Sequence, residues 1–282
     1  MGHALQASSA HLIPPIRLIG IDVDGTLVGA SGIVPPAVWE AAARVRNAGI
    51  HLALCSGRPA FGVALDYARQ LDPRGWHVFQ NGASVMHLES GESLSIPIAQ
   101  ESVHTLIAAA RSSHHVLELY SDQAYVAEID NRWAREHAEL LGIPFDPRPF
   151  ESLTGPIVRA QWLVSPEEAA EFVHRAPAHM EVAQSTSPIM PDTRFIGLTR
   201  EGVSKGSAMQ TIARAYGIPM EHVMYVGDAG NDLSALRVVG VPVAMANADA
   251  AVLSAAKHVA GNVEEGGLIV ALELALRSVH ER

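Results

Sequence analysis

The fold is decided by one stretch of the chain, Leu18-Ile19-Gly20-Ile21-Asp22-Val23-Asp24-Gly25-Thr26 (residues 18–26). Its first part is a short apolar run, typical of a strand buried in a parallel sheet, and it stops at two acids and a glycine. Because side chains alternate in direction along a strand, Asp22 and Asp24 project to the same side of its end. Close carboxylates raise the pKa of one of them or require a cation, and both outcomes are useful in catalysis. A plain Asp-Gly turn with solvated acids is the alternative interpretation.

Similar apolar runs alternate with helical periodicity in the first and last thirds of the chain. In the first third we expect helices over 36–48 and 61–71, and strands over 51–55 and 78–80. In the last third we expect helices over 204–216, 232–238 and 267–280, and strands over 223–226, 241–244 and near residue 259. This order predicts right-handed crossovers and a Rossmann-like parallel sheet with helices on both faces, an α/β fold.

The middle of the chain has a different pattern, typical of antiparallel strands separated by helices. The expected strands are 94–98, 116–128, 157–164 and 180–199, and the expected helices are 101–112, 130–141 and 166–175. We therefore expect an inserted α+β domain over 84–194. The core domain then consists of 17–83 and 195–282, and residues 1–16 are expected to form a disordered leader.

The composition excludes several classes of protein. The chain has 282 residues, of which 48% are apolar and 18% charged, as in ordinary folded proteins. A net charge of -10 without a run of Lys and Arg argues against a nucleic-acid binder. Cys55 is the only cysteine, so an intrachain disulfide is impossible and a cytoplasmic location is the default expectation. No apolar stretch is long enough for a membrane span.

Two further motifs combine a strand end or helix start with groups that bind phosphate. Cys55-Ser56-Gly57-Arg58 follows an expected strand, where a hydroxyl and backbone amides can hold a phosphoryl oxygen. Gly202-Val203-Ser204-Lys205-Gly206 opens an expected helix, and a cation there opposes the helix dipole unless an anion lies beside it. Alone, the first is more often an ordinary turn and the second a solvated lysine.

A fourth motif supplies more oxygen ligands at the end of another strand. Gly227-Asp228-Ala229-Gly230-Asn231-Asp232 follows an apolar run and offers two acids and an amide. Such a set suits Mg²⁺, which prefers carboxylates, waters and substrate phosphate. Open α/β sheets place their ligands at the carboxyl ends of their strands, so all four motifs are expected at one sheet edge.

In this order, D-x-D-G-T at 22–26, S-G-R at 56–58, the helix-opening Lys205 and G-D-x-x-N-D at 227–232 resemble the four motifs of the haloacid dehalogenase superfamily. The match spans nearly the whole chain. The insertion between Arg58 and Lys205 resembles the α/β cap of subclass IIB, the Cof-like phosphatases. This resemblance implies a phosphatase that hydrolyses small phosphorylated metabolites, such as sugar phosphates or phosphorylated cofactors, through an aspartyl-phosphate.

The resemblance also implies a role for each motif residue. Asp22 is the expected nucleophile and Asp24 the general acid and base, while Ser56 and Lys205 hold the phosphoryl oxygens. The cofactor is expected to be Mg²⁺, and its expected ligands are the Asp22 carboxylate, the Asp24 backbone carbonyl and the Asp228 carboxylate, with Asp232 in support. The expected substrate-binding residues are Gly25, Thr26, Gly57, Arg58, Asn231 and, from the cap, Arg194.

Two other functions are compatible with the motifs. A phosphomutase of the same superfamily would share all four and return the phosphoryl group to the substrate. A non-catalytic protein that binds a phosphorylated ligand would be expected to lack Asp22 or Asp24, and both are present. The expected partner is a small phosphorylated metabolite, with neither nucleic acid nor membrane; the sequence selects neither the physiological substrate nor an oligomeric state.

Overall fold

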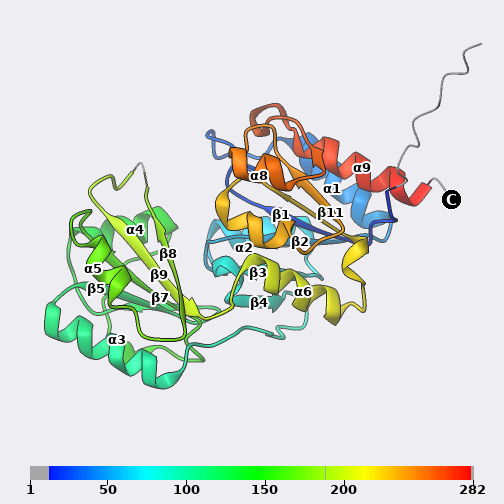
Figure 1. Cartoon of the computed structure of the whole chain (residues 1–282). Helices are drawn as coiled ribbons and strands as arrows, with labels where there is room; N and C mark the ends of the chain where they lie inside the picture. The colour runs from blue at the N-terminus through cyan, green and yellow to red at the C-terminus, as the bar shows by residue number, and fades with distance from the viewer. Residues whose placement is uncertain (1–12, 188, 281–282) are drawn as a thin grey trace, which may run out of the picture.

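The computed structural model describes residues 13–187 and 189–280, and it contains two β-sheets (Figure 1). The larger sheet has seven strands in the order β12-β11-β10-β1-β2-β3-β4. Its strands are β1 (Leu18–Asp22), β2 (His51–Cys55), β3 (Trp76–Phe79), β4 (Ser84–His87), β10 (Val223–Gly227), β11 (Val241–Ala244) and β12 (His258–Val259). All neighbouring strands are parallel except β3 and β4. The expected α/β fold with a parallel-sheet core is confirmed.

Helices cover both faces of this sheet because its strands are apolar on both sides. Ile19 and Ile21 of β1 belong to a buried cluster with the helices α1 (Pro36–Asn47), α2 (Val63–Leu71) and α9 (Leu268–His280). Leu18 belongs to a second cluster, with α6 (Lys205–Ala215), α7 (Leu233–Leu236) and α8 (Ala250–Ala255). Adjacent side chains of one strand thus anchor opposite helix layers, as alternation requires.

The smaller sheet is antiparallel and has five strands in the order β6-β5-β7-β9-β8. The cap formed around it contains the strands β5 (Val116–Tyr120), β6 (Tyr125–Ala127), β7 (Arg159–Val164), β8 (Met180–Ser185) and β9 (Arg194–Arg200) and the helices α3 (Gln100–Ser113), α4 (Arg132–Leu141) and α5 (Ala169–His174). Leu119 and Trp162 point to the face that packs on α3 and α5. On the other face, α4 packs near Val116 and Leu163 and contacts Glu118 through His137, while Tyr120 and Arg159 on the same face line a cavity that also contains Asp22.

The limits of the segments differ from those expected at three places. The expected inserted domain starts at residue 84, whereas β4 pairs with β3 in the larger sheet. It ends at 194, whereas β9 runs through the smaller sheet to Arg200. Residues 1–12 of the expected leader lie outside the described residues, but its end is ordered: Ile16 is buried and its backbone amide donates to Ser278 Oγ at 3.0 Å. We therefore propose that the cap spans roughly the chain between β4 and α6.

One expected element is absent, and most others match closely. Residues 94–98, expected as a strand, form an extended connection from the core to the cap that belongs to no strand. The expected strands 51–55 and 241–244 have the observed bounds of β2 and β11. In the part of the chain that the structure describes, no helix combines the length and apolar character needed to cross a bilayer.

Candidate active site

The four motifs meet at the carboxyl-terminal edge of the larger sheet. Asp22, the last residue of β1, pairs with Cys55 at the end of β2, so Ser56 follows directly beside it. On the other side Ile21 pairs with Val226 of β10, which brings the 227–232 loop alongside. Cys55 itself is buried with its Sγ against Met209, which fits the packing role of a small hydrophobic side chain.

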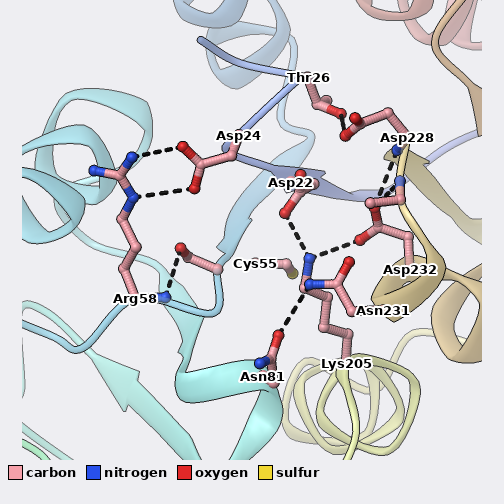
Figure 2. Close-up of polar contacts among 12 residues, drawn as sticks. Asp22, Asp24, Thr26, Cys55, Arg58, Asn81, Lys205, Asp228, Asn231 and Asp232 are labelled. Carbon is pink, nitrogen blue, oxygen red and sulfur yellow. Dashed lines mark hydrogen bonds and ion pairs between the residues drawn. The ribbon is translucent and has the colours of Figure 1, made fainter. Parts of the chain in front are cut away.

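Lys205 lies at the centre of the site (Figure 2). Its Nζ donates to Asp22 Oδ1 at 2.5 Å and to Asp232 Oδ1 at 2.7 Å, and the side chain has no exposed surface. Ser204 caps α6 through a capping box with Ser207, which fixes Lys205 as the first residue of the helix. Burial alone would lower the pKa of Lys205, but the two carboxylates outweigh it and the pKa lies above its usual value. The ammonium therefore stays charged.

Asp232 anchors the loop that carries Asp228. Its Oδ2 accepts from the backbone amides of Asp228 and Ala229 at 3.0 and 3.1 Å. Its Oδ1 accepts from Lys205 and from the Tyr225 hydroxyl, the latter at 2.6 Å. A carboxylate has about four lone-pair sites, so these contacts use its full accepting capacity. Asp232 is therefore suited to orienting its neighbours.

Asp228 faces the loop after β1. Thr26 Oγ1 donates to Asp228 Oδ1 at 3.0 Å. Gly25 has φ +85°, and a Cβ at that position would lie 2.1 Å from Asp228 Oδ2. The close approach therefore requires glycine. Asn247 Nδ2 donates to the Gly25 carbonyl at 2.8 Å and closes the loop from the other side.

The carboxylates of Asp22, Asp228 and Asp232 could hold a metal ion, because one oxygen of each lies within 4.8 Å of the others. Burial raises the pKa of Asp22 well above its usual value; Lys205 opposes this effect, and Asp232 and Asp228 add to it. The pKa of Asp228 is raised mainly by burial as well. A crowded set of oxygen donors, in which Asp22 and Asp228 have raised pKa values, fits a hard divalent cation, which would favour the ionised forms of these two.

Asp24 is directed away from this cluster. Figure 2 shows its carboxylate turned towards Arg58, whose Nε and NH2 donate to Oδ2 and Oδ1 at 3.0 and 2.5 Å. The Ser56 hydroxyl is buried and accepts from the Arg58 backbone amide at 3.0 Å, and its own hydrogen has no acceptor among the described residues. The Asp24 side chain is 59% exposed, unlike that of Asp22 at 7%. The two acids of the first motif thus occupy different environments.

A family model described as haloacid dehalogenase-like hydrolase matches residues 19–272. The chain belongs to this family.

Three relatives of this haloacid dehalogenase-like hydrolase illustrate the similarity. A pyridoxal phosphate phosphatase of Escherichia coli is 29% identical over 87% of this chain and 93% of its own. A haloacid dehalogenase-like hydrolase from Bacteroides thetaiotaomicron has a solved structure with a TM-score of 0.81 and 26% identity over 92% of this chain and 99% of its own. A structure titled as a subclass IIB sugar phosphatase has a TM-score of 0.75 and 25% identity over 92% of this chain and 98% of its own. The expected superfamily and cap subclass are confirmed.

Two adjoining cavities separate the core of this hydrolase from its cap. One, of about 310 Å³, is lined by Asp22, Asp24, Gly57 and Arg58. The other, of about 510 Å³, is lined by Lys205 and by β8 and β9 of the cap. Asn231 lines both cavities, and its Nδ2 donates to Asn81 Oδ1 at 3.1 Å.

Arg194, the cap residue expected to bind substrate, donates to the carbonyls of Pro191 and Thr193 and lines neither of these two cavities. Arg159 at the start of β7 lines both instead, and its NH1 donates to the Gly57 carbonyl of the core at 3.2 Å. The signal that could have found it is Arg159-x-Gln161 opposite Glu118-x-Tyr120, two polar pairs at strand spacing.

Proposed function

We propose that the chain is an Mg²⁺-dependent phosphatase that transfers the phosphoryl group of a small metabolite to Asp22 and then to water. The observation that carries this proposal is the buried Asp22 carboxylate, which Lys205 holds at a cavity edge with Asp228 beside it. Membership of a hydrolase family with phosphatases among its relatives makes the chain a phosphoric monoester hydrolase. The relatives act on sugar phosphates and pyridoxal phosphate, which supports a small phosphorylated metabolite as the substrate class.

In the first step an Asp22 oxygen attacks phosphorus while the bond from phosphorus to the leaving oxygen breaks. Asp24 protonates that oxygen, so the alcohol leaves neutral. In the second step Asp24 takes a proton from water, whose oxygen attacks phosphorus and releases phosphate and the Asp22 carboxylate. Lys205 and the Ser56 hydroxyl are proposed to donate to phosphoryl oxygens throughout, which their positions beside Asp22 and after β2 support.

Asp22 and Asp228 are the proposed carboxylate ligands of Mg²⁺, and Asp232 is proposed to act through the atoms it orients. When bound, the ion neutralises carboxylate and phosphate charge that one lysine cannot balance. Like charges at about 4 Å repel by roughly 4 kcal/mol at an effective dielectric near 20, so an anionic substrate needs this compensation.

The ion pair of Asp24 with Arg58 sets a condition on catalysis. Both Asp24 oxygens accept from Arg58 in this conformation, so Asp24 has to leave at least one of these bonds to reach the leaving oxygen. Both side chains are partly exposed, so breaking the pair costs about 1 kcal/mol or less. The ion pair therefore keeps Asp24 near the site but is weak enough to break during catalysis.

The test compares Asp22→Asn with Asp66→Asn, a control on an exposed acid of α2. Phosphate release from phenyl phosphate is measured with MgCl₂ and with excess chelator, and folding is checked by circular dichroism. We expect Asp22→Asn to fold and to retain less than about a thousandth of the activity, and the control to match the wild type. Turnover that survives the substitution or the chelator contradicts the proposal. Isomerised sugar phosphate without free phosphate would indicate the phosphomutase.

A further inference from the structure

The cap places a row of polar side chains beside the active site, on the face of its sheet that α4 covers only in part. Glu118 and Tyr120 of β5 lie directly opposite Gln161 and Arg159 of β7. Glu118 and Gln161 are 0% and 1% exposed, so this is not a solvated sheet face. Burying a carboxylate and an amide is costly unless every polar atom has a partner, so their arrangement requires an explanation.

Glu118 is the hub of the row. Its Oε2 accepts from the Tyr120 hydroxyl at 2.6 Å and from Gln161 Nε2 at 3.1 Å, and its Oε1 pairs with Nδ1 of His137 at 2.8 Å. Burial raises the pKa of Glu118, but the contacts with His137 and Tyr120 and the charge of Arg159 lower it more, so the carboxylate is ionised. The contact from Nε2 fixes the Gln161 amide with its oxygen towards Arg159.

Arg159 makes three contacts and still has N–H donors without an acceptor among the described residues. Its NH2 donates to Gln161 Oε1, its NH1 donates to the Gly57 carbonyl, and its guanidinium lies 5.3 Å from the centre of the Tyr120 ring. Of the five N–H groups of a guanidinium, three therefore have no acceptor among the described residues. Arg159 lines both cavities, so these donors are available to a molecule that extends from the phosphoryl site.

Small residues beside Arg159 leave room for such a molecule. Gly197 of β9 lies opposite Gln161 and Ala183, in the same row as Glu118. A Cβ at Gly197 would lie 3.6 Å from Nε and NH2 of Arg159, which is ordinary contact distance, but a longer side chain would enter the space in front of the guanidinium. The cavity of about 510 Å³ therefore lies against a part of the sheet that carries small residues, Ala183 and Gly197.

We propose that Arg159 determines specificity by donating hydrogen bonds to oxygen atoms of the leaving group, and that Glu118 is a positioning residue that holds Gln161 and so Arg159. This rests on the proposed phosphatase function. The substrates it selects are phosphoesters whose leaving alcohol carries further acceptor oxygens, either hydroxyls or a carboxylate. An apolar leaving group would fill the same space but leave the Arg159 donors unpaired, which costs affinity.

Another role for Arg159 has to be separated from this one. Its bond to the Gly57 carbonyl joins cap to core, so it also stabilises the closed arrangement. A contact that only helps the cap to close raises the rate for every substrate by a similar factor, because the cap closes before the chemical step whatever the leaving group is. A specificity contact serves only the substrates that it touches.

The experiment measures kcat and KM with MgCl₂ for phenyl phosphate, whose leaving group has no further oxygen, and for panels of neutral sugar phosphates and of sugar-acid phosphates. The variants are Arg159→Met, Glu118→Gln and Gly197→Leu. The control is Arg175→Met, an exposed cap arginine paired with Glu171. Circular dichroism and urea unfolding show whether each variant is folded.

We expect Arg159→Met and Gly197→Leu to lower kcat/KM for the best oxygen-rich substrate by about 10- to 100-fold, and for phenyl phosphate by less than about 3-fold. Glu118→Gln is expected to raise KM for the oxygen-rich substrate more than KM for phenyl phosphate, and Arg175→Met is expected to change neither. A larger loss on sugar-acid phosphates identifies a carboxylate as the acceptor, and equal losses on both panels identify hydroxyls.

Two results would overturn the proposal while the phosphatase stands. They are equal losses on phenyl phosphate and the oxygen-rich panels, or a wild-type enzyme that prefers phenyl phosphate to both panels. Absence of phosphate release from every compound would instead refute the phosphatase itself.

Discussion

Replacing Lys205 by methionine tests the electrostatic balance on which the site depends. Methionine nearly matches the length of lysine but carries no charge, so Asp22 and Asp232 lose the cation between them. Both carboxylates are buried, and Lys205 Nζ contacts both within 2.7 Å. The variant isolates the loss of charge from a loss of packing.

The size of the effect follows from the burial of the pair. Removing one partner of a buried ion pair destabilises by about 3–5 kcal/mol, and here two carboxylates lose the same partner. Protonation limits the loss: without Lys205, the burial that already raises the pKa of Asp22 acts unopposed. The folded variant then binds a proton that the unfolded chain binds only at lower pH, so its stability falls as pH rises. We expect a loss of about 3–5 kcal/mol at pH 8 and a smaller one at pH 5.

Urea unfolding in chelator at both pH values measures this difference. Lys257→Met is the matched control, because Lys257 is exposed and donates only to the Gly240 carbonyl in the described structure. The double variant Lys205→Met with Asp232→Asn should regain part of the stability, since one of the two stranded charges is gone, while activity stays absent. A loss below about 1 kcal/mol at pH 8, or no gain in the double variant, would refute the charge argument.

Three further predictions concern other parts of the structure. Burial lowers the pKa of His77 from 6.5 to about 4, so the folded state favours the neutral ring. The free energy of unfolding should therefore fall by about 3 kcal/mol as pH drops from above 6.5 to about 4. Urea unfolding of His77→Asn should not show this dependence of stability on pH. Gly25→Ala should weaken Mg²⁺ activation at least about 10-fold, measured as the MgCl₂ concentration for half-maximal activity, because its Cβ would displace Asp228; an unchanged value would contradict the close approach. Asp122 accepts from the hydroxyls of Ser84, Ser93 and Ser95 at 2.6–2.7 Å where core meets cap, so Asp122→Ala should speed hydrogen exchange over 84–95 and leave α1 unchanged.

The core of the fold could be predicted because its signals are local. Strands buried on both faces appear as short apolar runs, and β2 and β11 have their predicted bounds for this reason. The four motifs could be placed at one edge because parallel strands share a direction. The spacing of the motifs does not predict which side chains pair across the site. Asp232 accepts from Lys205, Tyr225 and two backbone amides, and these contacts depend on the conformation of the folded loop.

The domain boundaries and the cap residues at the cavities depend on long-range structure, which local sequence signals do not specify. Strand β4 continues from β3 through a turn at Gln80 and Asn81, both with positive φ, which is unusual for residues other than glycine. Gly82, with φ +108°, lies in the same turn, and the Asn81-Gly82 pair marks a turn without indicating that β4 pairs back on β3. Arg194 and Arg159 both stand at the start of an antiparallel strand, and which start faces the core depends on the strand order, a long-range property.

The two halves of the site are built differently, and this follows from what each has to recognise. The phosphoryl group is the same in every substrate, and the core holds its ligands by buried contacts that leave little freedom: Asp22, Lys205 and Asp232 form one bonded chain. The leaving group varies between phosphoesters, and we propose that the cap contacts it with side chains on a sheet, where changing Arg159 or Gly197 does not alter the core strands. A substitution in the cap can therefore change the substrate without altering the chemistry, whereas one at Lys205 cannot.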